Sequence, residues 1–120
     1  MNLRTLLITA VLMLVLSGLA RAAELSTAPM FRAGSHSIIC SITNVSTASQ
    51  TVRIRIYDLG GAVQTDSGNL VLAPRASTVQ TFEGDGHCRF TTVNAKTLFR
   101  ASIAVYNYNT ANIVASLPAQ

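Results

Sequence analysis

Several residue types are scarce in this sequence, and each scarcity narrows what the protein can be. Among 120 residues there is no tryptophan, a single lysine, two histidines and two cysteines, and only 12% of the residues are charged. Without any Lys/Arg cluster, the chain lacks the basic footprint of a nucleic-acid-binding protein. The main apolar run, Leu6–Leu16, is too short for a transmembrane helix, which needs roughly 20 apolar residues.

The N-terminal segment has the pattern of a secretory signal peptide. A short lead containing Arg4 precedes the apolar run, and Ala20-Arg21-Ala22 matches an A-x-A cleavage site. We therefore expect residues 1–22 to be a signal peptide and residues 23–120 to form a single exported domain, either periplasmic or secreted. An uncleaved N-terminal anchor is the alternative.

Removal of the signal peptide changes the charge balance. The whole chain carries a formal net charge of +4, and two of its nine basic residues, Arg4 and Arg21, lie in the signal segment. Seven basic and five acidic residues then remain, a net charge of about +2. The basic isoelectric point of the full chain is therefore no argument for a nucleic-acid partner.

The two cysteines, Cys40 and Cys88, predict a disulfide. An even number of cysteines in an oxidising compartment is most simply a bridge. Closing a loop of some 48 residues would stabilise the fold by roughly 4 kcal/mol on the chain-entropy account. Two separate buried thiols are the alternative.

Segments of alternating apolar and polar residues recur along the chain. The alternation is clearest at 36–43, 51–58 and 98–106, where it predicts half-buried strands. Turn residues such as Gly60-Gly61 separate the segments about every ten residues. Further short strands are expected at 63–65, 70–72, 78–82, 87–93 and 112–117, with an edge strand near Met30. The pattern predicts an all-β fold, an antiparallel sandwich of about seven to eight strands, with a small barrel as the alternative.

The positions of the cysteines agree with a sandwich. Cys40 shares a strand face with Ile38 and Ile42, and Cys88 shares a face with Phe90. Both cysteines are therefore expected to point into the core from strands far apart in the sequence. A bridge between two facing sheets needs this arrangement.

The middle of the chain resembles the immunoglobulin-like β-sandwich domains of small exported bacterial proteins. The resemblance rests on Ile42-Thr-Asn-Val-Ser46, on Thr51-Val-Arg-Ile-Arg-Ile-Tyr-Asp58 followed by Gly60-Gly61, and on Leu72-Ala-Pro-Arg-Ala-Ser77. It implies an immunoglobulin-like fold and brings no catalytic residues with it. Unlike antibody domains, the chain has no tryptophan to pack on the bridge.

The sequence offers little for catalysis or metal binding. A zinc site usually needs three or four ligands, and only His36 and His87 accompany the cysteines. Glu83-Gly-Asp-Gly86 has fewer oxygen donors than a calcium loop of the EF-hand type and suits a hairpin loop. No G-x-S-x-G elbow is present, and the neighbours Ser35 and His36 would not face each other on a strand. We expect a non-enzymatic protein with no cofactor and no metal.

One further motif, Asn44-Val45-Ser46, matches the acceptor pattern for N-glycosylation. The signal segment looks bacterial, so we interpret these residues as a polar turn between two strands.

The outward positions of two strands suggest a binding surface. Outward-facing residues at 51–58 and 98–106 are rich in arginine and tyrosine, which are favoured at interfaces. If the two strands are neighbours, these residues form one patch suited to an anionic envelope polymer. The alternative is an ordinary solvated face. The candidate residues are Arg53, Arg55, Tyr57, Arg100 and Tyr106.

Together these features predict an exported binding or structural module whose partner is an envelope or extracellular protein or polymer. One alternative is a pilus or fimbrial subunit, a type that borrows a strand from its neighbour. The expected last strand at 112–117 favours a self-sufficient monomer instead. A small secreted enzyme, or an inhibitor of one, is the remaining alternative.

Overall fold

The computed structural model describes residues 22–32 and 34–120, so the predicted signal peptide, except for Ala22, lies outside the described residues. In the described part, no helix is long and apolar enough to cross a membrane. One short 3-10 turn, η2 (Lys96–Leu98), precedes the eighth of nine strands. The strands are β1 (Ala23–Ser26), β2 (His36–Asn44), β3 (Gln50–Asp58), β4 (Val63–Asp66), β5 (Leu70–Leu72), β6 (Ser77–Phe82), β7 (Gly86–Thr92), β8 (Phe99–Asn107) and β9 (Asn112–Pro118).

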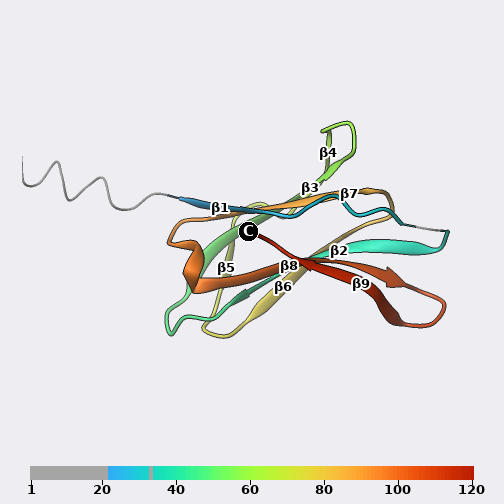
Figure 1. The fold of residues 1–120 in the computed structure, drawn as a ribbon. Coiled ribbons are helices and arrows are strands. Elements are labelled where there is room, and N and C mark those ends of the chain that lie inside the picture. The colour runs from blue at the N-terminus through green and yellow to red at the C-terminus, as the bar shows by residue number, and fades with distance from the viewer. Residues whose placement is uncertain (1–21, 33) are drawn as a thin grey trace, which may run out of the picture.

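The strands form two antiparallel sheets. One sheet has the order β1-β7-β3-β4, with β5 also paired to β3, and the other has the order β6-β2-β8-β9. Figure 1 shows the two sheets as layers, with β1 and β7 in one and β2, β8 and β9 in the other. The prediction of an all-β fold with facing antiparallel sheets is confirmed.

The alternation in the sequence positions each strand against the core. In β3, Val52, Ile54 and Ile56 are at most 1% exposed, while the intervening residues are partly exposed. The pleat sends successive side chains to opposite faces, so every second residue is buried. β9 is different, because all seven of its residues are exposed at the edge of its sheet.

The predicted disulfide between Cys40 and Cys88 is confirmed. Cys40 belongs to β2 and Cys88 to β7, and their Cα atoms are 5.8 Å apart. Both cysteines are fully buried, and each lies on an interior strand of its sheet. The side chains packed around the bridge are mainly aliphatic: Leu25, Ile38, Ile42, Val52, Ile54, Ile56, Leu72, Phe90, Phe99, Ile103 and Val105.

The N-terminal edge strand lies elsewhere than predicted. The strand is β1 at Ala23–Ser26, whereas Met30 forms only an isolated bridge with Gly86. Proline has no amide hydrogen for a ladder, so Pro29 interrupts the pairing with β7. Between the two stretches, the Thr27 hydroxyl accepts a hydrogen bond from the Cys88 amide at 2.9 Å. With β1 included, residues 22–32 and 34–120 form nine strands, where seven to eight were expected.

Loss of the disulfide should weaken the domain strongly. We expect the double variant Cys40→Ala/Cys88→Ala to lose roughly 4 kcal/mol of unfolding free energy, because the bridge closes a long loop in the unfolded chain. Urea unfolding of the two proteins measures the difference. Reductant should destabilise the parent and leave the variant unchanged, and a loss below about 1 kcal/mol would contradict the expectation.

Candidate functional site

The structure separates the five residues of the predicted arginine and tyrosine patch. Arg53, Arg55 and Tyr57 lie on β3, which pairs with β7, β4 and β5, while Arg100 and Tyr106 lie on β8 of the other sheet. The single patch required β3 and β8 to be neighbours, and this assumption is wrong. The outward faces of two facing sheets point in opposite directions, so the five residues do not form one patch.

Arg53 and Arg55 are occupied by a carboxylate of the same molecule. The Arg53 guanidinium donates two hydrogen bonds to Asp66 on β4, at 2.8 Å from Nε and 2.6 Å from NH2. Arg55 Nε lies 3.5 Å from the same carboxylate. The hydrogen bonds from Arg53, and one from the Gly68 amide, hold the pKa of Asp66 well below its usual range.

Tyr57 belongs to a stack that spans β3 and β7. Its ring lies parallel to the His87 imidazole, with centroids 5.3 Å apart, and the Arg89 guanidinium lies 5.3 Å from the Tyr57 centroid. Arg89 Nε is in turn 3.1 Å from Glu24 Oε1 of β1. Arg53, Arg55 and Arg89 with their acids Asp66 and Glu24 are called the paired surface below.

Tyr106 lies far from Arg100, although both are on β8. Six residues of extended strand separate them by roughly 20 Å. Tyr106 packs edge-on against Tyr108 with centroids 5.5 Å apart, and the Tyr108 hydroxyl accepts a hydrogen bond from the buried Ser37 hydroxyl at 2.9 Å. Tyr106 lies opposite Ser37 in the ladder of β2 and β8 and packs against the tyrosine that binds Ser37. Its contacts therefore give no reason to assign it to an anion-binding site.

One buried side chain, Asn44 at the end of β2, organises the end of the sandwich nearest η2. It is fully buried, and its Nδ2 group donates to the carbonyls of Ala48, Leu72 and Ala73 at 2.8, 3.1 and 3.2 Å. Its Oδ1 accepts from the amide and the hydroxyl of Ser46. The Asn44-Val45-Ser46 motif is thus a turn, as the sequence suggested, and its amide nitrogen is inaccessible.

The backbone of the same segment holds two further turns in place. The Asn44 amide donates to the Ala76 carbonyl and the Val45 amide to the Leu98 carbonyl, each at 2.9 Å. These contacts bring the 73–76 turn and η2 to one end of the molecule. Three basic residues lie on these segments and are called the basic end: Arg75 in the turn, Lys96 in η2 and Arg100 at the start of β8.

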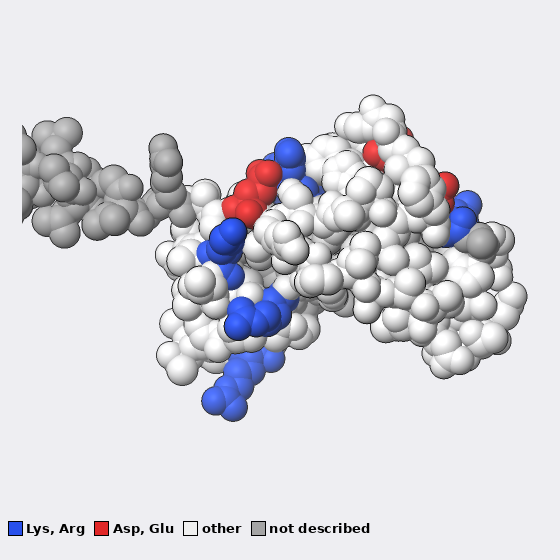
Figure 2. Space-filling view, in the orientation of Figure 1, with Lys and Arg blue, Asp and Glu red and all other residues white. Residues whose placement is uncertain are grey.

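The basic end has no acidic partner among the described residues. The three ion pairs in this part of the chain all use arginines of the paired surface. The Arg100 guanidinium donates instead to the carbonyls of Thr97 and Phe99, at 3.4 and 2.9 Å. Figure 2 shows several of the visible basic side chains at this end, with an acidic side chain beside the uppermost of them. The end therefore offers three cations that form no ion pair among the described residues, and these can attract an anion.

Arg75 occupies a backbone position that usually favours glycine. It follows Pro74 in a turn closed by a 3.0 Å hydrogen bond from the Ala76 amide to the Ala73 carbonyl, and its φ is 63°. A turn with proline second and positive φ third normally takes glycine or asparagine there. The Leu-x-Pro turn was recognisable in the sequence, but the exposure of a basic side chain at its tip was not.

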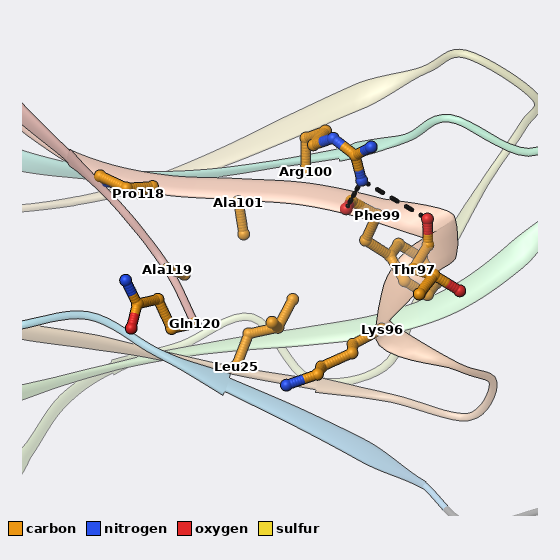
Figure 3. Close-up of a pocket in the computed structure, with 9 residues that line it drawn as sticks. All are labelled: Leu25, Lys96, Thr97, Phe99, Arg100, Ala101, Pro118, Ala119 and Gln120. Carbon is orange, nitrogen blue, oxygen red and sulfur yellow. Dashed lines mark hydrogen bonds between the residues drawn. The ribbon is translucent and has the colours of Figure 1, made fainter.

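A cavity opens beside the basic end, at the edge where the two sheets meet. Its volume is about 240 Å³, and Figure 3 shows the side chains around it. Gln120 joins the two sheets beside this cavity, since Ser26 and Gln120 exchange two backbone hydrogen bonds at 2.9 and 3.0 Å. The lining residues are Leu25, Lys96, Thr97, Phe99, Arg100, Ala101, Pro118, Ala119 and Gln120.

The described residues contain no group of three or more His, Cys, Asp or Glu side chains that could hold a metal ion. His36 and His87 lie at the starts of β2 and β7, and His87 is stacked on Tyr57. Comparison with family models, curated proteins and solved structures found no significant match. The paired surface, the basic end and the cavity are therefore the candidate sites of the described residues.

Asn44 should be essential for stability. We expect Asn44→Ala to cost roughly 2–3 kcal/mol, because buried carbonyl groups and the Ser46 amide lose their partners. Thermal or urea unfolding measures the loss. Asn69→Ala, in an exposed turn, is the matched control and should change stability by less than about 0.5 kcal/mol. Equal effects of the two substitutions would refute the role of Asn44.

Asp66 should contribute a stability that depends on pH. Its lowered pKa means that its carboxylate favours the folded state above the ordinary aspartate pKa of about 3.9, and that this contribution is lost as the pH falls through the folded value. We expect Asp66→Asn to destabilise the protein at pH 7 and to have a diminishing effect in acid. Urea unfolding across this range tests it, with Glu83→Gln as the charge-matched control. A destabilisation by Asp66→Asn that is independent of pH would contradict the assignment.

Proposed function

We propose that this chain is an exported, non-enzymatic binding module whose basic end contacts an anionic polysaccharide of the cell envelope. One observation carries the proposal: Arg75, Lys96 and Arg100 share one end of the domain, and none has an acidic partner among the described residues. A polymer with regularly spaced carboxylates would supply the missing negative charge.

The Arg75 backbone supports the use of this end for binding. A non-glycine residue with positive φ costs free energy that glycine would avoid. An arginine at this position brings a cation to the tip of a turn. The paired surface is less suited to the same role, because an incoming anion would have to displace Asp66 or Glu24.

Export is supported by the disulfide together with the N-terminal pattern. Bridges of this kind form and persist in oxidising compartments outside the cytoplasm, and the run Leu6–Leu16 suits a signal peptide. β9 supports a monomer, since the chain pairs its own last strand with β8. A subunit completed by a neighbour's strand would lack this pairing.

We also propose a relation to immunoglobulin-like domains. In those domains the second strand pairs with the fifth, the third with the sixth, and a bridge links the second to the sixth. Here β2 pairs with β6, β3 pairs with β7, and the bridge links β2 to β7. If β4 and β5 are counted together as the fourth strand, β6 becomes the fifth strand and β7 the sixth. The central pairings and the position of the bridge are then the same as in immunoglobulin-like domains. The terminal strands depart from the pattern, because β1 lies beside β7 and β8 beside β2.

Binding to sodium polygalacturonate, a carboxylated polysaccharide, tests the proposed function. We expect the triple variant Arg75→Gly/Lys96→Ser/Arg100→Ser to bind about tenfold more weakly than the parent, and parental binding to fall with added salt. Arg75→Gly alone should weaken binding without loss of stability, because glycine relieves the backbone. Calorimetric titration and urea unfolding give the two readouts.

The matched control removes three charges from the paired surface, as Arg53→Ser/Arg55→Ser/Arg89→Ser. This variant should retain most of the affinity. An equal loss in both triple variants would mean that binding follows net charge alone, and the proposal would fail. Absence of binding to the polymer, with binding to phosphatidylglycerol vesicles instead, would replace the polysaccharide by a lipid surface.

A further inference from the structure

The edge cavity exists because two small side chains occupy paired positions. The Ala119 amide donates to the Ala101 carbonyl at 2.9 Å, so the two alanines lie side by side on neighbouring segments of one sheet. Across the gap, Leu25 of β1 approaches from the other sheet. Larger residues at 101 and 119 would fill this space and seal the edge of the core.

Apolar side chains face the open space of the cavity, and a lysine side chain lies along one side of it. In Figure 3 the side chains of Leu25, Ala101 and Ala119 converge on the open space, and the Lys96 side chain runs along its β1 side. Arg100 points away, toward the carbonyls of Thr97 and Phe99. Lys96 is therefore the cation available at the rim, and no ion pair among the described residues involves it.

We propose that this cavity binds a medium-chain carboxylate, with the alkyl chain between the sheets and the carboxylate on Lys96. The volume of about 240 Å³ corresponds to roughly eight water-sized groups, which suits a chain of about six to eight carbons. Alkyl burial against Leu25, Phe99 and the alanines supplies the attraction, and Lys96 selects an anionic head group. This site adjoins the basic end, with which its lining shares Lys96 and Arg100, but its apolar part lies outside that surface.

Titration of the isotope-labelled, disulfide-bonded protein with sodium octanoate, followed by NMR, tests the proposal. We expect amide shifts confined to the segments around Leu25, Phe99, Ala101 and Ala119, with a Kd on the order of 1 mM or below. Octylammonium should bind at least about tenfold more weakly, because its head group carries the charge of Lys96. Sodium acetate should produce no comparable shifts.

Three variants separate the two parts of the site. Ala101→Leu should abolish octanoate binding by filling the cavity, and Ala119→Val is the second filling variant if the first does not fold. Lys96→Met should weaken octanoate binding about fivefold and leave octanol unaffected. Arg75→Gly, which lies outside the cavity, should leave octanoate binding intact while it weakens polygalacturonate binding.

Other outcomes would overturn the proposal. Equal affinity for octanoate, octanol and octylammonium would show an apolar void without selection by Lys96. Shifts centred on Ala28 and Leu117 would place the ligand in the neighbouring cavity of about 220 Å³, which shares Pro118 and Gln120 with this one. Octanoate binding that survives both filling variants in folded protein would also refute it, whatever the result with the polymer.

Discussion

The Cys40–Cys88 bridge joins an interior strand of one sheet to an interior strand of the other, at a point where both side chains are fully buried. The core around it is small and aliphatic, without a tryptophan. A covalent link at the centre fixes the distance between the sheets. Packing at the edges of the sheets is therefore not needed to hold them together. This allows a pairing of the N-terminal segment with β7 that Pro29 interrupts, an edge strand β9 exposed along its whole length, and a cavity between paired alanines.

The paired surface and the basic end differ for a physical reason. Arg55 and Arg89 lie directly opposite each other in the ladder of β3 and β7, and like charges in such positions destabilise a sheet. Asp66 and Glu24, on the flanking strands, offset that repulsion. Arg75 and Lys96 lie in turns, where the chain imposes no such juxtaposition. Arg100 lies on β8, but its cross-strand partner is the uncharged Thr43. The three cations of the basic end therefore remain available to a partner, because no strand pairing required their neutralisation.

The sequence predicted the properties that depend on local periodicity. The burial of Ile54 and Cys88 followed from alternation, and the disulfide followed from the two cysteines facing inward. The grouping of strands into sheets did not follow, because a period of two says which side chains point inward and leaves open which strands pair. Periodicity alone therefore cannot show that Arg53 and Arg100 lie on different sheets. Asn44 was recognised as a turn residue, but its three carbonyl partners come from segments up to 29 residues away, beyond the reach of local patterns.

The burial of Asn44 also limits where this protein can be produced. Its side-chain nitrogen forms part of an acceptor motif for N-linked glycans, and in the folded domain that nitrogen is enclosed and hydrogen-bonded. A eukaryotic secretory pathway would meet the motif on the nascent chain, before the fold can hide it. A sugar attached there has no room in the native structure, so modified chains would fail to close the end of the sandwich. A bacterial host, or a variant at Ser46 that removes the motif, avoids this competition between modification and folding.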